Sequence, residues 1–249
     1  GAAELAAFAT AAFCAACRVL SLQGGDERAG GMQAACPQAV FTALGVQSEA
    51  FASPFNAISP SFCSASADVD APFGSCGSFF ALEPPAGAVL LANPPFDGAT
   101  VLAMARRIDE LCDAADAADA ALASGTAAEG GEAGGLSVAV VVPRTPAEEG
   151  WRALKGSRHL RSELVLPRSK HAFVDGGQQY GRRQAPLRLS NHDSSLFWMQ
   201  SANARADAAA LTAARESFRA GFKVLGPLDG VAKKKKNNKK KRGRGEEES

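Results

Sequence analysis

The sequence has few of the residues that mark several protein classes. Only three histidines and one tyrosine occur among 249 residues, and the histidines show no paired spacing of the kind that zinc sites have. No apolar run reaches the roughly 18 residues of a membrane-spanning helix. The first residues also lack the basic segment that begins a signal peptide. We therefore expect no metal, no membrane partner and no secretory leader, whereas 46% apolar residues exclude wholesale disorder.

The charge of the chain is nearly balanced overall but unevenly distributed. The tail at 233–249 holds nine Lys and Arg and three acidic residues, so the 27 basic and 26 acidic side chains of the whole chain become 18 and 23 without it. The body is therefore mildly acidic, which argues against a protein that coats nucleic acid with its whole surface. Any nucleic-acid site must be local.

The six cysteines favour a reduced intracellular context, because the chain shows no secretory features. They are Cys14, Cys17, Cys36, Cys63, Cys76 and Cys112. Cys14 and Cys17 form a single CxxC, and a zinc site would require a second ligand pair. We interpret them as two small apolar residues one helical turn apart.

Hydrophobic periodicity predicts alternating helices and strands. Helices are expected at 1–20, 33–44, 100–122, 150–161 and 204–220. Strands are expected at 46–53, 87–92, 136–142, 163–166, 172–175 and 195–199. This alternation favours an α/β fold with a largely parallel sheet. Ligands of such sheets bind beyond the carboxyl ends of the strands, so the loops FASPFN at 51–56 and NPPF at 93–96 are the first places to look for a site.

The sequence Asn93–Pro94–Pro95–Phe96 follows a buried-strand pattern directly. Consecutive prolines have no N–H and a restricted φ, so the carbonyls of Asn93 and Pro94 are held rigidly. With the Asn93 side chain they form a cluster of acceptors, and Phe96 adds a flat face. This suits a planar group with an NH₂, such as adenine, although an Asn-capped Pro-Pro turn is the plain alternative.

Three segments surround and include this motif in a fixed order: 51–56, PFGSCGSFF at 72–80 and LLANPPF at 90–96. NPPF is similar to the (D/N)PP(Y/F) motif of S-adenosylmethionine-dependent amino-methyltransferases. The ordered set resembles the catalytic domain of the phosphorylated-CTD-interacting factor family, over about residues 15–200. Members of that family are cap-specific mRNA adenosine N6-methyltransferases. One departure is that the family's Pro-acidic-Trp step reads Pro143–Arg144–Thr145 here, with Trp151 displaced.

The resemblance implies a Rossmann-like methyltransferase fold. Its parts would be a helical N-terminal stub at 1–45, the methyltransferase domain at 46–225 with a flexible insertion at 114–135, and a disordered basic tail at 226–249. The catalytic residues would be Asn93, Pro94, Pro95 and Phe96.

The resemblance also implies which residues hold the S-adenosyl-L-methionine. The chain has no glycine-rich loop after its first predicted strand, and FASPFN stands in that place. Ser53, Pro54 and Asn56 would lie against the cofactor, with Gly31 and Gln33 contributing from an upstream loop. A plain strand-to-loop turn is the alternative for FASPFN. Residues 73–80 would cover the cofactor's adenine, unless Phe79 or Phe80 is ordinary core.

Basic residues recur every three positions in the predicted helix 150–161. They include Arg152, Arg158 and Arg161, which we expect on one face that meets RNA phosphates, with a solvated surface helix as the alternative. The resemblance adds His171 and Gln178 from a loop near the substrate.

The tail Lys233–Arg244 indicates a nuclear-localisation signal or a nucleic-acid tether, unless it is only solubilising. With the resemblance we expect a nuclear location. The expected partners are capped mRNA, nuclear import factors and, in a longer form, the RNA polymerase II C-terminal domain. Two other functions stay open: N6-adenine methylation of internal RNA or DNA, and a catalytically silent module that binds RNA or polymerase.

Overall fold

The computed structural model describes residues 1–22, 34–126, 134–174, 187–204 and 208–225. The predictions for Gly31, Gln33, Gln178 and the tail at 226–249 therefore lie outside the described residues.

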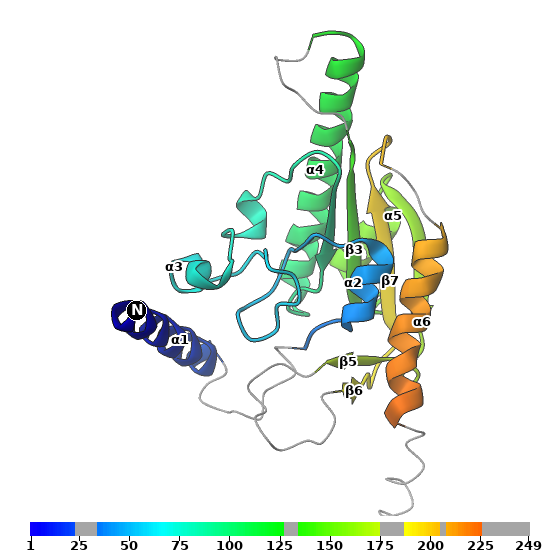
Figure 1. Ribbon diagram of the computed structural model, residues 1–249. Coiled ribbons are helices and arrows are strands. Elements are labelled where there is room, and N and C mark those ends of the chain that lie inside the picture. The colour runs from blue at the N-terminus through cyan, green and yellow to red at the C-terminus, as the bar shows by residue number, and fades with distance from the viewer. Residues whose placement is uncertain (23–33, 127–133, 175–186, 205–207, 226–249) are drawn as a thin grey trace, which may run out of the picture.

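A five-stranded mixed sheet forms the centre of the protein (Figure 1). Its strands, in spatial order, are β1 (Ser48–Glu49), β2 (Ala88–Ala92), β3 (Leu136–Pro143), β7 (Ser194–Gln200) and β4 (Leu160–Leu166). β1, β2 and β3 pair in parallel, whereas β7 runs antiparallel to both of its neighbours. The predicted α/β fold is confirmed, but the sheet is mixed: β1, β2 and β3 are parallel as predicted, whereas the reversed strand β7 makes both of its pairings antiparallel.

Helices cover both faces of this sheet. One face packs on α4 (Gly98–Ala123) and α5 (Glu149–Gly156), and the other on α2 (Gln38–Leu44) and α6 (Ala208–Leu225). Because side chains alternate along a strand, Val138 and Val140 of β3 face the first pair of helices, and Ala139 and Val141 face the second. The result is a three-layer α/β/α core, to which α2 belongs although it lies within the expected N-terminal stub.

Smaller elements pack around the carboxyl edge of the sheet. They are α3 (Ala67–Asp70), the 3₁₀ turns η2 (Ala71–Phe73) and η3 (Phe79–Ala81), and the paired strands β5 (Ala172–Val174) and β6 (Leu187–Leu189). Ala35 forms a bridge to Val174, with both backbone bonds present at 2.9 and 2.8 Å. This bridge ties the segment before α2 to β5.

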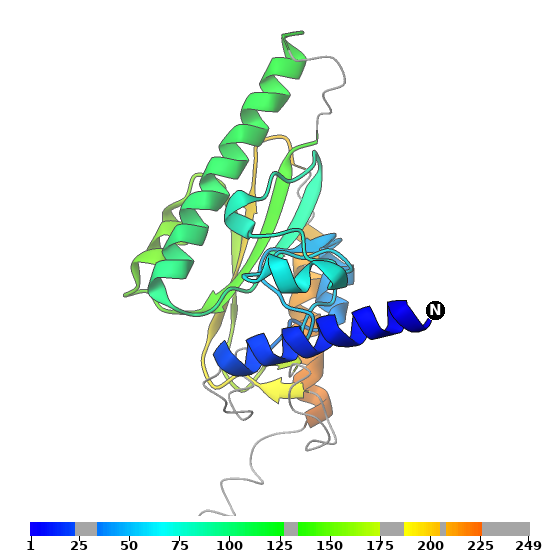
Figure 2. The same cartoon turned by 90° about the vertical axis from the view of Figure 1, so that its left-hand side faces the viewer.

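Helix α1 (Ala2–Leu22) lies outside the three layers, against α3 (Figure 2). It confirms the predicted helix, and most of it is exposed, including Leu5, Phe8 and Phe13. Its window Ala2–Ser21 has a mean hydropathy of 1.6 and is long and apolar enough, by length and composition alone, to cross a membrane. The expectation that no segment is long and apolar enough is therefore wrong. The many alanines of this helix keep its mean hydropathy high, although a few polar residues interrupt the apolar run.

Three predicted boundaries change in the structure. α4 continues to Ala123, so the first half of the predicted flexible insertion is helical. β1 has only two residues of the predicted strand at 46–53. α5 ends at Gly156 instead of residue 161, because the chain from Leu160 onward pairs with β7 as the edge strand β4.

Candidate functional site

The carboxyl ends of β1, β2 and β3 meet at one edge of the sheet, and the loops that follow them carry the predicted motifs. Residues 50–56 follow β1, residues 93–97 follow β2, and residues 144–148 follow β3. Because β7 is reversed, the residues that precede it, 190–193, reach this edge as well. We call this region the carboxyl edge.

Asn93 has an anchored amide and an unpaired carbonyl oxygen. Its Nδ2 donates a hydrogen bond to the Ala34 carbonyl at 2.9 Å, which sets the orientation of the side chain. Its Oδ1 is buried and accepts no hydrogen bond from the described part of the chain. Buried acceptors are nearly always paired in folded proteins, so an unpaired one at a loop tip marks a place for a ligand donor.

The rest of the motif is held between β2 and α4. Pro94 is buried and Pro95 is exposed, whereas the Phe96 side chain is 50% exposed. Asp97 then caps α4, because its Oδ1 accepts from the Thr100 N–H at 2.9 Å. The hydrogen bonds with Thr100 lower the pKa of Asp97, so the cap is charged near neutral pH.

His192 contacts Phe96 from the loop before β7. The two ring centroids lie 5.9 Å apart with an interplanar angle of 86°. His192 Nδ1 lies 2.8 Å from the Asn191 Oδ1, so Nδ1–H donates and Nε2 is left as an acceptor. This Nε2 is a second buried atom without a partner among the described residues. Burial lowers the pKa of His192, which keeps its ring neutral.

A pocket of about 150 Å³ borders Phe96 on the side of α4 and α5. Its walls include Gly98, Pro143, Thr145 and Trp151. The displaced Trp151 therefore lies beside Pro143 in space, where its Nε1 donates to the Ser195 hydroxyl at 3.1 Å. The pocket is smaller than the roughly 300 Å³ at which ligand pockets begin, so it can take only part of a substrate.

The FASPFN segment forms a compact turn at the carboxyl edge. Asn56 Oδ1 accepts hydrogen bonds from the Ser53 backbone N–H at 2.8 Å and from its hydroxyl at 3.2 Å. The base of the loop is tied by Glu49, whose Oε1 accepts from the backbone N–H groups of Ile58 and Ser59 at 2.6 and 2.8 Å. The predicted cofactor residues Ser53, Pro54 and Asn56 thus share one turn, and their contact with a cofactor stays a prediction.

An aromatic cluster adjoins this turn. Phe51 lies 5.2 Å from Phe79 and 6.0 Å from Phe80, measured between ring centroids. Phe79 is buried in the core, which confirms the core alternative for that residue, whereas Phe80 is 44% exposed.

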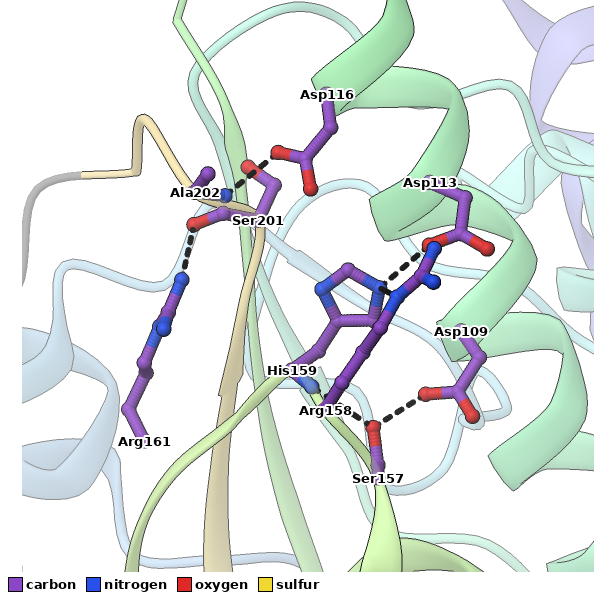
Figure 3. Close-up of polar contacts among 9 residues, drawn as sticks. All are labelled: Asp109, Asp113, Asp116, Ser157, Arg158, His159, Arg161, Ser201 and Ala202. Atoms are coloured by element: carbon purple, nitrogen blue, oxygen red, sulfur yellow. Dashed lines mark hydrogen bonds and ion pairs between the residues drawn. The ribbon is translucent and has the colours of Figure 1, made fainter.

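The basic residues predicted to bind RNA do not share a helix face. Of the three arginines, only Arg152 lies on α5, where its Nη1 donates to the Ala147 carbonyl at 2.9 Å. Arg158 and Arg161 lie at the opposite, amino edge of the sheet (Figure 3). There Arg158 pairs with Asp113, and Arg161 Nη2 donates to the Ser201 carbonyl at 3.2 Å. The helical arrangement predicted for them is therefore wrong.

His171 is also placed differently from its prediction. Its ring is completely buried and packs against Phe173 and Phe218. Nδ1 donates to the Pro167 carbonyl at 2.8 Å, and Nε2 accepts from the Ser194 hydroxyl at 3.0 Å. Burial lowers its pKa. A fully paired, buried ring cannot contact RNA, so the structure contradicts that prediction.

His192 and Ala34 are the residues of this edge that the sequence did not indicate. No motif surrounds His192, and Ala34 lies within the stretch of family resemblance but is not among the site residues that the resemblance implies. A loop that precedes an antiparallel strand lies at the carboxyl edge of its parallel neighbours, but the reversal of β7 is not visible in its continuous apolar pattern.

Together the fold and this edge define an α/β protein with a candidate ligand site around the Asn-Pro-Pro-Phe loop. A family model described as "Phosphorylated CTD interacting factor 1 WW domain" matches residues 2–176, which is most of the chain. The chain belongs to this phosphorylated CTD interacting factor 1 family.

Two curated relatives, from Homo sapiens and Mus musculus, both carry the name mRNA (2'-O-methyladenosine-N(6)-)-methyltransferase. Each is 29% identical to this chain over 176 residues, which is 68% of this chain and 22% of the relative. The chain thus spans about a fifth of the length of the curated relatives that it matches.

Proposed function

We propose that this chain is a Rossmann-like methyltransferase that modifies N6 of the cap-adjacent 2'-O-methyladenosine of mRNA, with S-adenosyl-L-methionine as the methyl donor. The observation that carries the proposal is the buried Asn93 Oδ1 at the end of β2, which has no partner in the described part of the chain and lies beside the half-exposed Phe96. The names of the two relatives support the choice of substrate.

The geometry of Asn93 suits an amine substrate. Its Oδ1 accepts one N–H of the adenine amine, the Pro94 carbonyl accepts the other, and the ring packs on Phe96. These bonds favour a pyramidal nitrogen whose lone pair leaves the ring plane, so catalysis comes from orientation and electrostatic stabilisation. The bond from Asn93 Nδ2 to Ala34 holds the acceptor before the substrate arrives.

The turn at Ser53–Asn56 is the proposed place for the methyl donor, because small residues there allow close backbone approach. S-adenosyl-L-methionine supplies an electrophilic methyl group when it is bound. Ser53, Pro54 and Asn56 would hold it, and it would give its methyl group to the amine nitrogen, with the electron pair of the broken C–S bond staying on sulfur and the amine proton passing to water. No general base is required before attack, because the proton becomes acidic only after transfer.

Two further parts of the proposal concern partners and location. The family's printed name refers to a phosphorylated CTD, so we propose the RNA polymerase II C-terminal domain as a partner. The composition of the tail at 226–249 supports binding of nuclear import factors and a nuclear location.

Methyl transfer to matched RNAs tests the function. Labelled S-adenosylmethionine is offered with a short RNA that begins with a 7-methylguanosine cap and 2'-O-methyladenosine, and with the same RNA uncapped. Cap-dependent transfer that is lost in Asn93→Ala supports the proposal. Equal transfer to uncapped RNA or DNA moves the substrate to internal adenines, and failure to bind the methyl donor in calorimetry favours a silent binding module.

A further inference from the structure

Two arginines at the carboxyl edge differ from the other described arginines. The guanidinium groups of Arg144 and Arg168 have no hydrogen-bond or ion-pair partner within the described ranges, and both residues are exposed. Eight other described arginines have such a partner. Among the described arginines, the lack of a partner is thus a local feature of Arg144 and Arg168 and not a general property.

The backbone brings these two arginines to the same loop. The Arg144 N–H donates to the Asp193 carbonyl at 2.8 Å, and the Arg168 N–H donates to the Asp193 Oδ1 at 2.7 Å. Asp193 directly follows His192, whose ring contacts Phe96. The loop is braced further, because the Ser190 hydroxyl donates to the His192 carbonyl at 2.7 Å. The backbones of Arg144 and Arg168 are therefore anchored to the residue next to His192, whose ring contacts Phe96.

We propose that Arg144 and Arg168 form a phosphate-binding site for the RNA strand whose adenosine packs on Phe96. This proposal rests on the proposed function for its choice of ligand and adds two residues to the site. Guanidinium groups bind phosphate oxygens through two parallel hydrogen bonds, and an unpaired guanidinium loses no internal partner when it does so. His192 Nε2, which has no partner among the described residues, offers a hydrogen-bond acceptor in the same loop.

Arg144 and Arg168 take the phosphate-binding role that the sequence predicted for Arg158 and Arg161. Those guanidinium groups are occupied at the amino edge, whereas a strand that leaves the Phe96 ring meets the carboxyl edge first. The phosphates could belong to the cap triphosphate or to the phosphodiesters beyond the adenosine, which share the same chemistry.

The test compares two double variants with equal charge change. One is Arg144→Gln with Arg168→Gln, and the control is Arg106→Gln with Arg219→Gln, which removes two exposed arginines paired to Glu149 and Glu216. Fluorescence anisotropy measures binding of labelled capped RNA at several salt concentrations. The site variant is expected to bind about tenfold more weakly, with the slope of log affinity against log salt reduced by about 1.4, and the control is expected to bind as the wild type does.

The outcomes separate the site from the activity. Three results would overturn the phosphate site. They are an equal loss of RNA affinity in both double variants, an unchanged affinity in the site variant, and no RNA binding by the wild type. Wild-type protein that transfers no methyl group but binds RNA in an Arg144- and Arg168-dependent way would end the proposed function and leave the site standing. Weakening with both capped and uncapped RNA assigns the site to phosphodiesters, and weakening with capped RNA alone assigns it to the cap triphosphate.

Discussion

The two edges of the sheet differ in the hydrogen bonding of their polar side chains. At the amino edge, one cluster of side chains is paired: His159 Nε2 donates to Asp113 at 2.6 Å, Arg158 pairs with the same carboxylate, and the Ser157 hydroxyl donates to Asp109 at 2.5 Å (Figure 3). Outside this cluster, Asp119 uses Oδ1 to accept from the Gly134 N–H, and its Oδ2 is buried without a partner among the described residues. At the carboxyl edge, Asn93 Oδ1 and His192 Nε2 are buried without partners in the described structure.

This difference suggests that the paired cluster at the amino edge serves stability and the unpaired atoms at the carboxyl edge serve ligand binding. A paired buried group stabilises the fold, whereas an unpaired one costs about 1–3 kcal/mol until a ligand supplies its partner. The amino edge therefore holds α4 to the start of β4, and the carboxyl edge keeps hydrogen-bonding capacity for a substrate. Substitutions at the two edges are expected to have opposite consequences.

Asn93→Ala should produce the largest effect. Loss of the acceptor that orients the amine is expected to lower kcat by about 100-fold or more, as for other single preorganised hydrogen-bonding groups. The melting temperature should change little, because only the bond to Ala34 is lost. Methyl-transfer kinetics together with thermal denaturation check both parts. If the variant were strongly destabilised and its folded fraction kept the wild-type kcat, Asn93 would serve stability, and the proposed difference between the two edges would be wrong.

Phe96→Ala should act in the same direction but less strongly. Base–aromatic stacking contributes about 1–3 kcal/mol, so kcat/KM for RNA is expected to fall roughly 10- to 100-fold. Phe13→Ala on α1 is the matched control, because that ring is 70% exposed and lies far along the chain from the motif. If both variants kept wild-type kinetics, Phe96 would not be a stacking surface.

Asp113→Ala should affect stability and leave the chemistry intact. The variant deprives the buried His159 of its acceptor and Arg158 of its ion pair, which is expected to destabilise the fold by about 2 kcal/mol. Urea denaturation measures this change, and kcat at a temperature where the variant is folded should equal the wild-type value. Reduced kcat without destabilisation would assign the amino edge a role in the reaction.

Acid should weaken the amino edge, with the smallest effect. The hydrogen bonds from Arg158 and His159 lower the pKa of Asp113 in the folded state. Its contribution to stability is therefore present above the unfolded pKa of about 3.9 and is lost as the pH falls through the folded value. The melting temperature of Asp113→Asn should consequently decline less than that of the wild type below pH 4. The carboxylate is half exposed, so solvent screening keeps the difference small.

Much of the carboxyl edge could be predicted from local sequence. The apolar run before Asn93 is a local signal for a strand that ends there, and this strand is confirmed. The helix predicted from residue 100 is also confirmed, although it begins at Gly98. The positions of Arg158, Arg161 and His192 could not be predicted in the same way. They depend on β7 entering the sheet in reverse between β3 and β4, which is a pairing between segments far apart in the sequence.

The hydrogen bond between Asn93 Nδ2 and the Ala34 carbonyl also has an evolutionary consequence. Related motifs accept Asp or Asn at this position, but an Asp here would place a second oxygen against a carbonyl that can only accept. An amide-to-acid exchange at position 93 would then be tolerated only together with a rearrangement of the backbone at Ala34. The identity of the first motif residue and the path of the segment before α2 should therefore change together in descendants of this chain.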